Sequence, residues 1–213
     1  MNTKIALGSF LFCVSSVFYF ESSMAIAQDR MPPIPADKLT DAQKKAIDEF
    51  KTARRNDISG PFVPLLRSPE VMTRARAMGD YLRFKSALPP RLSEFVILMT
   101  ARRWTQNYEW NAHAPLAIKG GLKPEIIDAI ADGRRPAQMA KDEQALYDLV
   151  DELERNQSVS DPTYANAIAA VGEQGLIDAV ALVGQYSMLA MILNTARTPL
   201  PDGAKPALKP FPK

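Results

Sequence analysis

The chain has 213 residues, of which 46% are apolar and 23% are charged, and it contains one cysteine and one histidine. This composition is typical of a globular protein and excludes a disordered or collagen-like chain. The 26 basic residues nearly balance the 24 acidic ones and form no basic block, so we expect no nucleic-acid partner. One histidine and one cysteine also argue against a multi-histidine or cysteine-rich metal site and an internal disulfide, and we expect no metal.

The first 27 residues have the pattern of an export signal. Lys4 precedes a mostly apolar run over residues 5–20, and Ala25-Ile26-Ala27 supplies the small residues of a cleavage site. The run of about 16 residues is shorter than the roughly 20 that span a bilayer, although a retained anchor is the alternative. We predict a signal peptide at residues 1–27, a periplasmic or secreted location, and no stable membrane insertion after cleavage.

The rest of the chain, residues 28–213, predicts one helix after another. No alternating apolar stretch competes as a strand, so we expect a single all-α domain with proline-rich ends. Thr40 and Gln43 form the pattern of a capping box before the first helix. A helix begins near Ser68-Pro69-Glu70 and runs to about residue 88, where Pro89-Pro90 ends it. Further helices are expected at residues 92–105, 107–119, 124–132, 141–156, 161–171 (with Asp161 as the N-cap) and 176–196.

The last helix and the two ends of the domain have different compositions. Residues 176–196 are apolar on all sides, which predicts burial in the core or in a subunit interface. Residues 31–35 and the segment from residue 198 onward hold most of the prolines that do not begin helices. We expect both to be extended and free of internal hydrogen bonds, either lying along a neighbouring subunit or remaining mobile.

Polar side chains that could take part in catalysis occur close together in residues 94–113. Glu109 and His113 are four residues apart and share one helix face, where a carboxylate orients an imidazole and favours its protonated form. Gln106 lies one turn earlier and can donate to a developing oxyanion, and Glu94 can reach the same place from the preceding helix. Trp110 is a candidate substrate contact, although core or interface burial also explains it. The competing interpretation of the Glu–His spacing is a solvent-exposed pair without function.

Three segments, in order, resemble the carboxymuconolactone decarboxylase-like family, which also contains the alkylhydroperoxidase D (AhpD) type. They read LSEFVILMTARRWTQNYEWNAHAPLAIKGGL from residue 92, KPEIIDAIAD from residue 123, and IDAVALVGQYSMLAMILNTARTPLP from residue 177. The resemblance implies an AhpD-like helical domain with a central helical hairpin. It also implies self-association to a trimer or hexamer, with which the apolar last helix is consistent.

The peroxidase branch of that family has two cysteines and a histidine after an upstream glutamate. In this chain the glutamate is Glu94, the cysteine positions hold Gln106 and Glu109, and the histidine is His113. No cysteine follows residue 27, so thiol peroxidase activity is disfavoured. The resemblance to the thiol-free branch implies a cofactor-free lyase that decarboxylates a carboxylated lactone or related small carboxylate. His113 would then be the proton donor, Glu109 would set its protonation, and Glu94 would hold the site or share the proton, with Gln106 and Trp110 at the substrate.

Two other functions remain open at this point. Lactone catabolism of this kind is normally cytoplasmic, whereas the chain carries an export signal, so the fold can instead serve as an exported non-catalytic binding or oligomeric scaffold. A cofactor-free isomerase or hydrolase would use the same Glu–His relay. A partly buried Glu109–His113 pair that faces a cavity would favour an enzyme, and a fully exposed pair would favour the scaffold.

Overall fold

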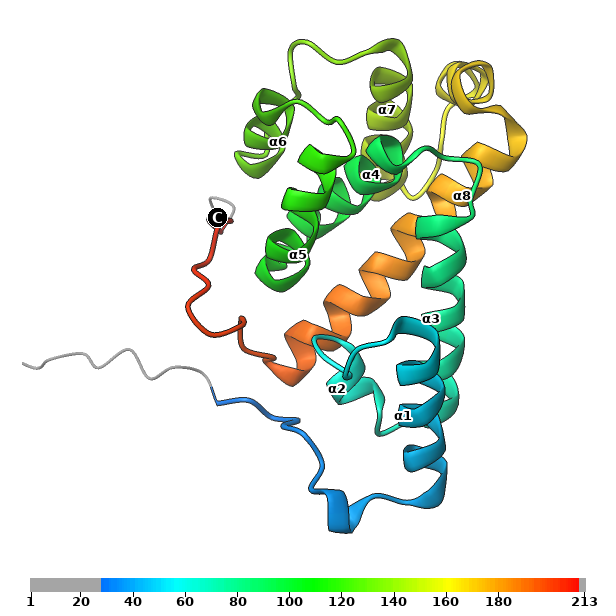
Figure 1. Cartoon of the computed structure of the whole chain (residues 1–213). Coiled ribbons are helices and arrows are strands. Elements are labelled where there is room, and N and C mark those ends of the chain that lie inside the picture. Colours follow the sequence, from blue (N-terminus) through cyan, green and yellow to red (C-terminus); the bar gives the residue numbers. More distant parts are fainter. Residues whose placement is uncertain (1–27, 211–213) are drawn as a thin grey trace, which may run out of the picture.

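The computed structural model describes residues 28–210, so the signal-peptide prediction for residues 1–27 lies outside the described residues. Within residues 28–210 there are helices and loops but no strands, which confirms the all-α prediction (Figure 1). The elements in chain order are η1 (Ala36–Lys38), α1 (Asp41–Arg54), α2 (Phe62–Leu65), α3 (Pro69–Phe84), α4 (Pro90–Arg103), α5 (Asn107–Lys119), α6 (Pro124–Ala131), α7 (Lys141–Asn156) and α8 (Asp161–Ala196).

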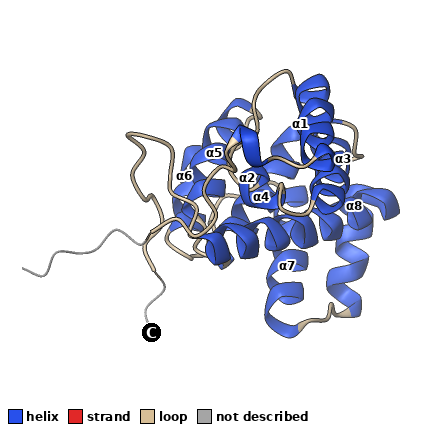
Figure 2. Ribbon diagram, turned by 90° about the horizontal axis from the view of Figure 1, so that it is seen from below, coloured by secondary structure: helices blue, strands red, loops and turns tan. Residues whose placement is uncertain are grey.

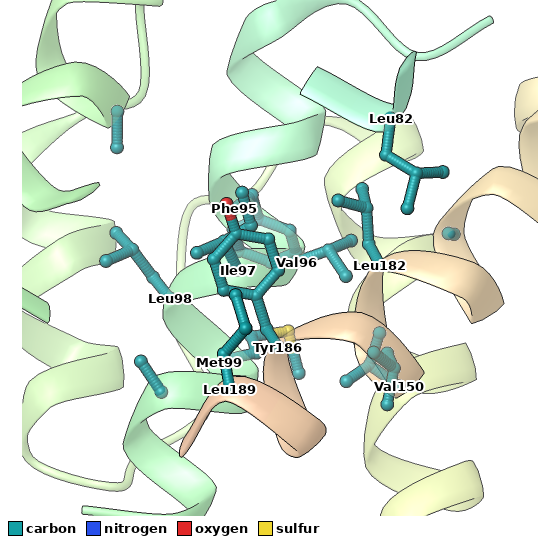
Figure 3. Packing of buried hydrophobic residues seen from close by; sticks show 14 of the residues in the cluster. Leu82, Phe95, Val96, Ile97, Leu98, Met99, Val150, Leu182, Tyr186 and Leu189 are labelled. Atoms are coloured by element: carbon teal, nitrogen blue, oxygen red, sulfur yellow. The ribbon is translucent and has the colours of Figure 1, made fainter. Parts of the chain in front are cut away.

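Helix α4 forms the centre of the fold. It is buried without interruption from Leu92 to Arg102 and contacts α3, α5, α6, α7 and α8. Its apolar side chains meet those of α8, as Figure 3 shows for Ile97 and Met99 beside Tyr186 and Leu189. Burying one large apolar side chain stabilises a fold by about 1.5–3 kcal/mol. The continuous burial of α4 therefore contributes strongly to stability and fixes the position of the helices around it.

Helices α4 and α5 form the central hairpin that the resemblance implied. Between them, Thr105 adopts a left-handed conformation with φ of 46°, and the backbone N–H of Gln106 donates to the carbonyl of Ala101 at 2.8 Å. The Gln106 side chain then caps α5 by accepting from the Tyr108 backbone N–H at 2.7 Å. This tight connection lays α5 back along α4, and α4 and α5 share more contacts than any other pair of helices in the described chain.

Helix α8 contains the break that the sequence predicts. Gly172 has φ of 72° and ψ of 173°, which interrupts the helix between the expected helices 161–171 and 176–196. The first part pairs with α7, as Figure 2 shows, and the second crosses the core. By length and composition α8 is also long and apolar enough to cross a membrane. However, 56% of its most apolar 18-residue stretch is buried inside the fold. Its apolar character is therefore that of a core helix.

Three local predictions need correction. Helix α3 ends at Phe84, not near residue 88, because the chain turns so that the Ala87 backbone N–H donates to Asp178 Oδ2 at 2.8 Å. Pro90 begins α4 as its first residue, a position where the missing N–H costs nothing. Ser160, not Asp161, is the N-cap of α8. The short helix α2 was not predicted, whereas the capping box of Thr40 is confirmed.

Both proline-rich ends lack regular secondary structure for most of their described length and also contact their own chain, while packing along a neighbouring subunit stays a prediction. The Arg30 backbone N–H donates to the Ala196 carbonyl at 2.8 Å, and residues 36–38 form a short 3-10 helix. At the other end, Leu208 is buried and its backbone N–H donates to Asn107 Oδ1 at 2.8 Å. The C-terminal segment runs beside α5 in Figure 1.

Candidate active site

The hairpin brings Glu94, Glu109 and His113 together in the interior. Glu94 Oε2 lies 2.5 Å from His113 Nδ1, and Glu109 Oε2 lies 3.5 Å from His113 Nε2. Each of the three residues is at most 6% exposed. The single histidine of the chain is therefore held between two buried carboxyl groups, one at each ring nitrogen.

Two further side chains hold this group in place. Arg83 of α3 places a guanidinium nitrogen 3.7 Å from Glu94 Oε1, so the carboxylate behind the imidazole has a cation on its other oxygen. The Tyr186 ring of α8 meets the His113 ring edge to face, with centroids 5.0 Å apart and planes at 87°. Because three helices other than α5 contribute these contacts, the orientation of the imidazole depends on the packing of the whole fold.

The Glu109–His113 pair faces a cavity of about 250 Å³. The cavity is bordered by helices α1, α2, α3 and α5, by the second part of α8, and by the loop that connects α1 to α2. Its lining residues are Phe50, Arg54, Asn56, Ser59, Pro61, Phe62, Gly79, Arg83, Tyr108, Glu109, Ala112, His113, Leu116, Gln185, Tyr186 and Leu189. Gly60 lets the loop close over Tyr108: its φ is +55°, and a Cβ there would lie 2.5 Å from the Tyr108 ring. A buried pair at a cavity is the arrangement that favours an enzyme.

The surroundings alter the proton affinity of two lining residues. Burial raises the pKa of Glu109, and this effect outweighs the nearby positive charges of His113 and Arg83, while Glu94 raises the pKa further. Glu109 therefore holds a proton at higher pH than an ordinary glutamate does. Burial also raises the pKa of the Tyr186 phenol well above its usual value, so this hydroxyl stays protonated and remains a hydrogen-bond donor.

Two predicted substrate contacts lie away from the cavity. Gln106 uses its side-chain oxygen to cap α5, and its Nε2 donates to Asn194 Oδ1 at 2.7 Å. The amide oxygen is thus engaged by the start of α5, and one N–H of the amide is engaged by α8. Trp110 is 4% exposed and belongs to the apolar core. Neither residue lines the cavity, so we withdraw both as substrate contacts.

Several lining residues were missed by the sequence reasoning. The sequence pattern does not assign Tyr186, Arg83 or Gln185 to the site. Gln185 is 2% exposed in an otherwise apolar helix, and a buried amide among alanine, valine and leucine is the one signal that could have indicated it. Arg83 gives no such signal, because arginine near a helix end is ordinary.

The arrangement of potential metal ligands is a further property of the described residues. In residues 28–210, no group of three or more His, Cys, Asp or Glu side chains has an arrangement suited to binding one. The described residues likewise contain no cysteine that could form a thiol site. The chemistry that the cavity residues offer is proton transfer by carboxyl and imidazole groups.

Comparison with known proteins finds a family model that matches part of the chain. Residues 69–152 match the model of the carboxymuconolactone decarboxylase family. The chain carries a carboxymuconolactone decarboxylase-like region. That region runs from the start of α3 into α7 and includes Glu94, Glu109 and His113.

The fold of the chain is of the AhpD type. It is similar to the crystal structure of a protein from Ralstonia eutropha JMP134, described as an alkylhydroperoxidase AhpD core and an uncharacterized peroxidase-related protein. The TM-score is 0.67 at 18% identity, and the match covers 81% of this chain and 92% of that one. No functionally curated protein matches the chain. The likeness at this identity shows the fold, so activity must be argued from the cavity.

Proposed function

We propose that the chain is a cofactor-free lyase that decarboxylates a carboxylated lactone or a related small carboxylate by proton transfer. The observation that carries this proposal is the buried series Glu94–His113–Glu109, which ends at a cavity. Buried titratable groups of this kind cluster at functional sites, because burying them costs stability. The match to the carboxymuconolactone decarboxylase family supports the same reaction class.

The reaction needs an electron sink and a proton. The bond between the substrate carbon and its carboxylate breaks, carbon dioxide leaves, and the bonding electrons pass into the conjugated lactone carbonyl to form an enolate. A proton then returns to carbon, so the net reaction consumes one proton. The substrate supplies the electron sink, and the protein has to supply the proton.

The geometry divides the work among the three residues. Glu94 contacts His113 Nδ1, so it holds the ring in one orientation and stabilises an imidazolium. Glu109 lies on the cavity side with a raised pKa and contacts Nε2. The proton delivered to carbon is the one held between Glu109 and Nε2. Glu94 therefore takes the orienting role that the sequence analysis had given to Glu109.

The charges around the cavity favour an anionic substrate. Arg54 and Arg83 both line it, and Arg76 and Asp80 lie beside Arg54 in one ion-pair network. The guanidinium groups of Arg54, Arg76 and Arg83 accompany the carboxylates of Asp80 and Glu94, and burial disfavours a negative charge on Glu109. A carboxylate entering this cavity balances the excess positive charge.

Isomerisation and hydrolysis are the alternative reactions for the same relay, and a thiol peroxidase is disfavoured because no cysteine follows residue 27. A non-catalytic scaffold is disfavoured by the burial of the Glu109–His113 pair.

Export, cleavage after Ala27, and assembly to a trimer or hexamer remain predictions. Size-exclusion chromatography with light scattering tests the assembly, and N-terminal sequencing of the exported protein tests the cleavage.

The proposal is tested with purified protein from Gln28 onward, treated with a chelator, against a panel of carboxylated and simple lactones. Loss of ultraviolet absorbance and release of carbon dioxide are followed together, with His113→Gln as the control. We expect turnover of at least one carboxylated lactone and none of it in the variant. Equal turnover by the variant would end the proposal, and absorbance loss without carbon dioxide would replace decarboxylation by isomerisation or hydrolysis.

A further inference from the structure

Three residues that line the cavity have buried polar atoms without a hydrogen-bond partner. These atoms are Arg83 Nε, Glu109 Oε1 and Gln185 Oε1. Buried polar atoms in folded proteins are almost always paired, since an unpaired one costs stability. Three of them around one cavity indicate that a bound molecule supplies the missing partners.

Gln185 presents an acceptor to that molecule. Its Nε2 donates to the Ala75 carbonyl at 2.9 Å, and a carbonyl oxygen can only accept, so the side-chain oxygen of Gln185 must occupy the other position of the amide. At 2% exposure this oxygen has no access to bulk solvent. An amide oxygen is satisfied by a donor, which means a hydroxyl or an N–H group on the ligand.

Arg83 presents a donor. Its Nε lacks a partner, while its terminal nitrogen contacts Glu94 Oε1 at the long distance of 3.7 Å. Arg54 lines the same cavity but is engaged, because its guanidinium contacts Asp80 at 2.8 Å. The Nε–H of Arg83 is thus a buried donor without a partner, and an anionic oxygen is its strongest partner.

We propose that the substrate has two recognition groups: a carboxylate that accepts from Arg83 and a hydroxyl or N–H group that donates to Gln185. This inference rests on the proposed function, because both residues line the cavity of the Glu109–His113 pair. The volume of about 250 Å³ limits the molecule to one small ring with its substituents, since a cavity of about 150 Å³ accommodates benzene. The substrate class is therefore a small hydroxylated cyclic carboxylate.

The test is a binding measurement that requires no turnover. Isothermal titration calorimetry of protein from Gln28 onward compares four probes: benzoate, benzamide, 3-hydroxybenzoate and 4-hydroxybenzoate. Benzamide removes the negative charge, and the hydroxybenzoates add a donor at two positions. The variants are Arg83→Met and Gln185→Met. Their matched controls are Arg74→Met, an exposed arginine of the same helix paired with Glu70, and Gln174→Met, an exposed glutamine of α8.

In wild type we expect benzoate to bind at least about tenfold tighter than benzamide, and one hydroxybenzoate to bind at least about tenfold tighter than benzoate, because a site built for a hydroxyl rejects the molecule that lacks it. Arg83→Met should abolish the first preference and Gln185→Met the second, each with an unchanged circular dichroism spectrum, while the controls keep both. Equal affinities for all four probes, or no binding to the folded wild type, would overturn the inference. Retained preferences without turnover of any lactone would refute the decarboxylase and leave the recognition groups standing.

Discussion

Glu109, which is buried, and Glu154, which is partly buried, are two carboxyl groups of the same chain with different surroundings. Burial raises the pKa of both, in the case of Glu154 from 4.5 to about 7, and both have an Oε1 atom without a partner. Glu154 lines a small hollow of about 110 Å³ beside Arg103 and Asp151. Glu109 instead contacts the imidazole of His113, which Glu94 holds from behind.

The difference shows that burial alone does not make a proton-transfer site. Glu154 retains a proton near neutral pH, but no imidazole accompanies it among the residues of its hollow. Glu109 has an acceptor on one side and a cavity on the other. A relay needs a second titratable group that can take and return the proton. Substitutions of His113, Glu94, Glu109 and Glu154 should each change the difference between the Glu109 site and the Glu154 site.

The largest effect is expected from His113→Gln, which turns the Glu109 site into a carboxyl group without an acceptor, like that of Glu154. Turnover should fall by about 10²–10⁴-fold, the usual contribution of general acid–base catalysis. Glutamine can still donate an N–H to Glu94, so helicity and melting temperature should change little. Steady-state kinetics and circular dichroism on the same preparations measure both, and an active variant contradicts the relay.

A smaller loss is expected from Glu94→Gln, because Glu94 positions the imidazole and does not line the cavity. We predict a fall in kcat of about 10–100-fold with KM nearly unchanged. Since the chain has one histidine, its ring nitrogens can be followed by NMR without assignment. The Nδ1 proton should resonate far downfield in wild type and lose that shift in Glu94→Gln; an identical spectrum in the two proteins would reject the positioning role.

Glu109→Gln should change the pH profile more than the maximum rate. The pKa of Glu109 is raised by burial, so the group carries its proton at low pH, and activity should fall as rising pH passes through this raised pKa. Glutamine does not titrate, which should flatten that side of the profile. Measuring kcat/KM from pH 5 to 9 for both proteins tests this, and a falling limb that persists in the variant would assign it to another group.

The smallest effect on activity is expected from Glu154→Gln, which should leave turnover unchanged and alter stability. The folded-state pKa of about 7 lies above the ordinary 4.5, so wild type loses stability as pH rises from about 4.5 through 7. The variant should therefore be more stable at pH 8, by about 2–3 kcal/mol, and equally stable at pH 4. Urea unfolding at the two pH values measures this, and a gain that is the same at both would reject the buried-acid account.

The sequence was sufficient for most of the helices and for part of the site. The bounds of α5 and α7 could be predicted because helical periodicity coincides there with clear stops, such as Gly120 after α5. Glu94, Glu109 and His113 could be grouped because two of them share a helix face and the third lies on the neighbouring helix. Local rules of this kind need no knowledge of distant packing.

The cavity could not be predicted, for a physical reason. Arg83 and Gln185 are about one hundred residues apart and meet only when α3 and α8 pack. Gln106 was assigned to the substrate from its spacing, but the turn between α4 and α5 needs a cap and uses that side chain. The roles of polar side chains thus depend on which backbone groups the fold leaves unsatisfied.

The most direct measurement of the central claim, that His113 delivers a proton to carbon, is turnover in D₂O analysed by proton and deuterium NMR of the product. The account predicts one deuterium at the carbon that lost its carboxylate in wild type, and a rate of incorporation that falls with turnover in His113→Gln. Product without a carbon–deuterium bond would indicate hydrolysis. Deuterium incorporated equally fast by His113→Gln would contradict the claim.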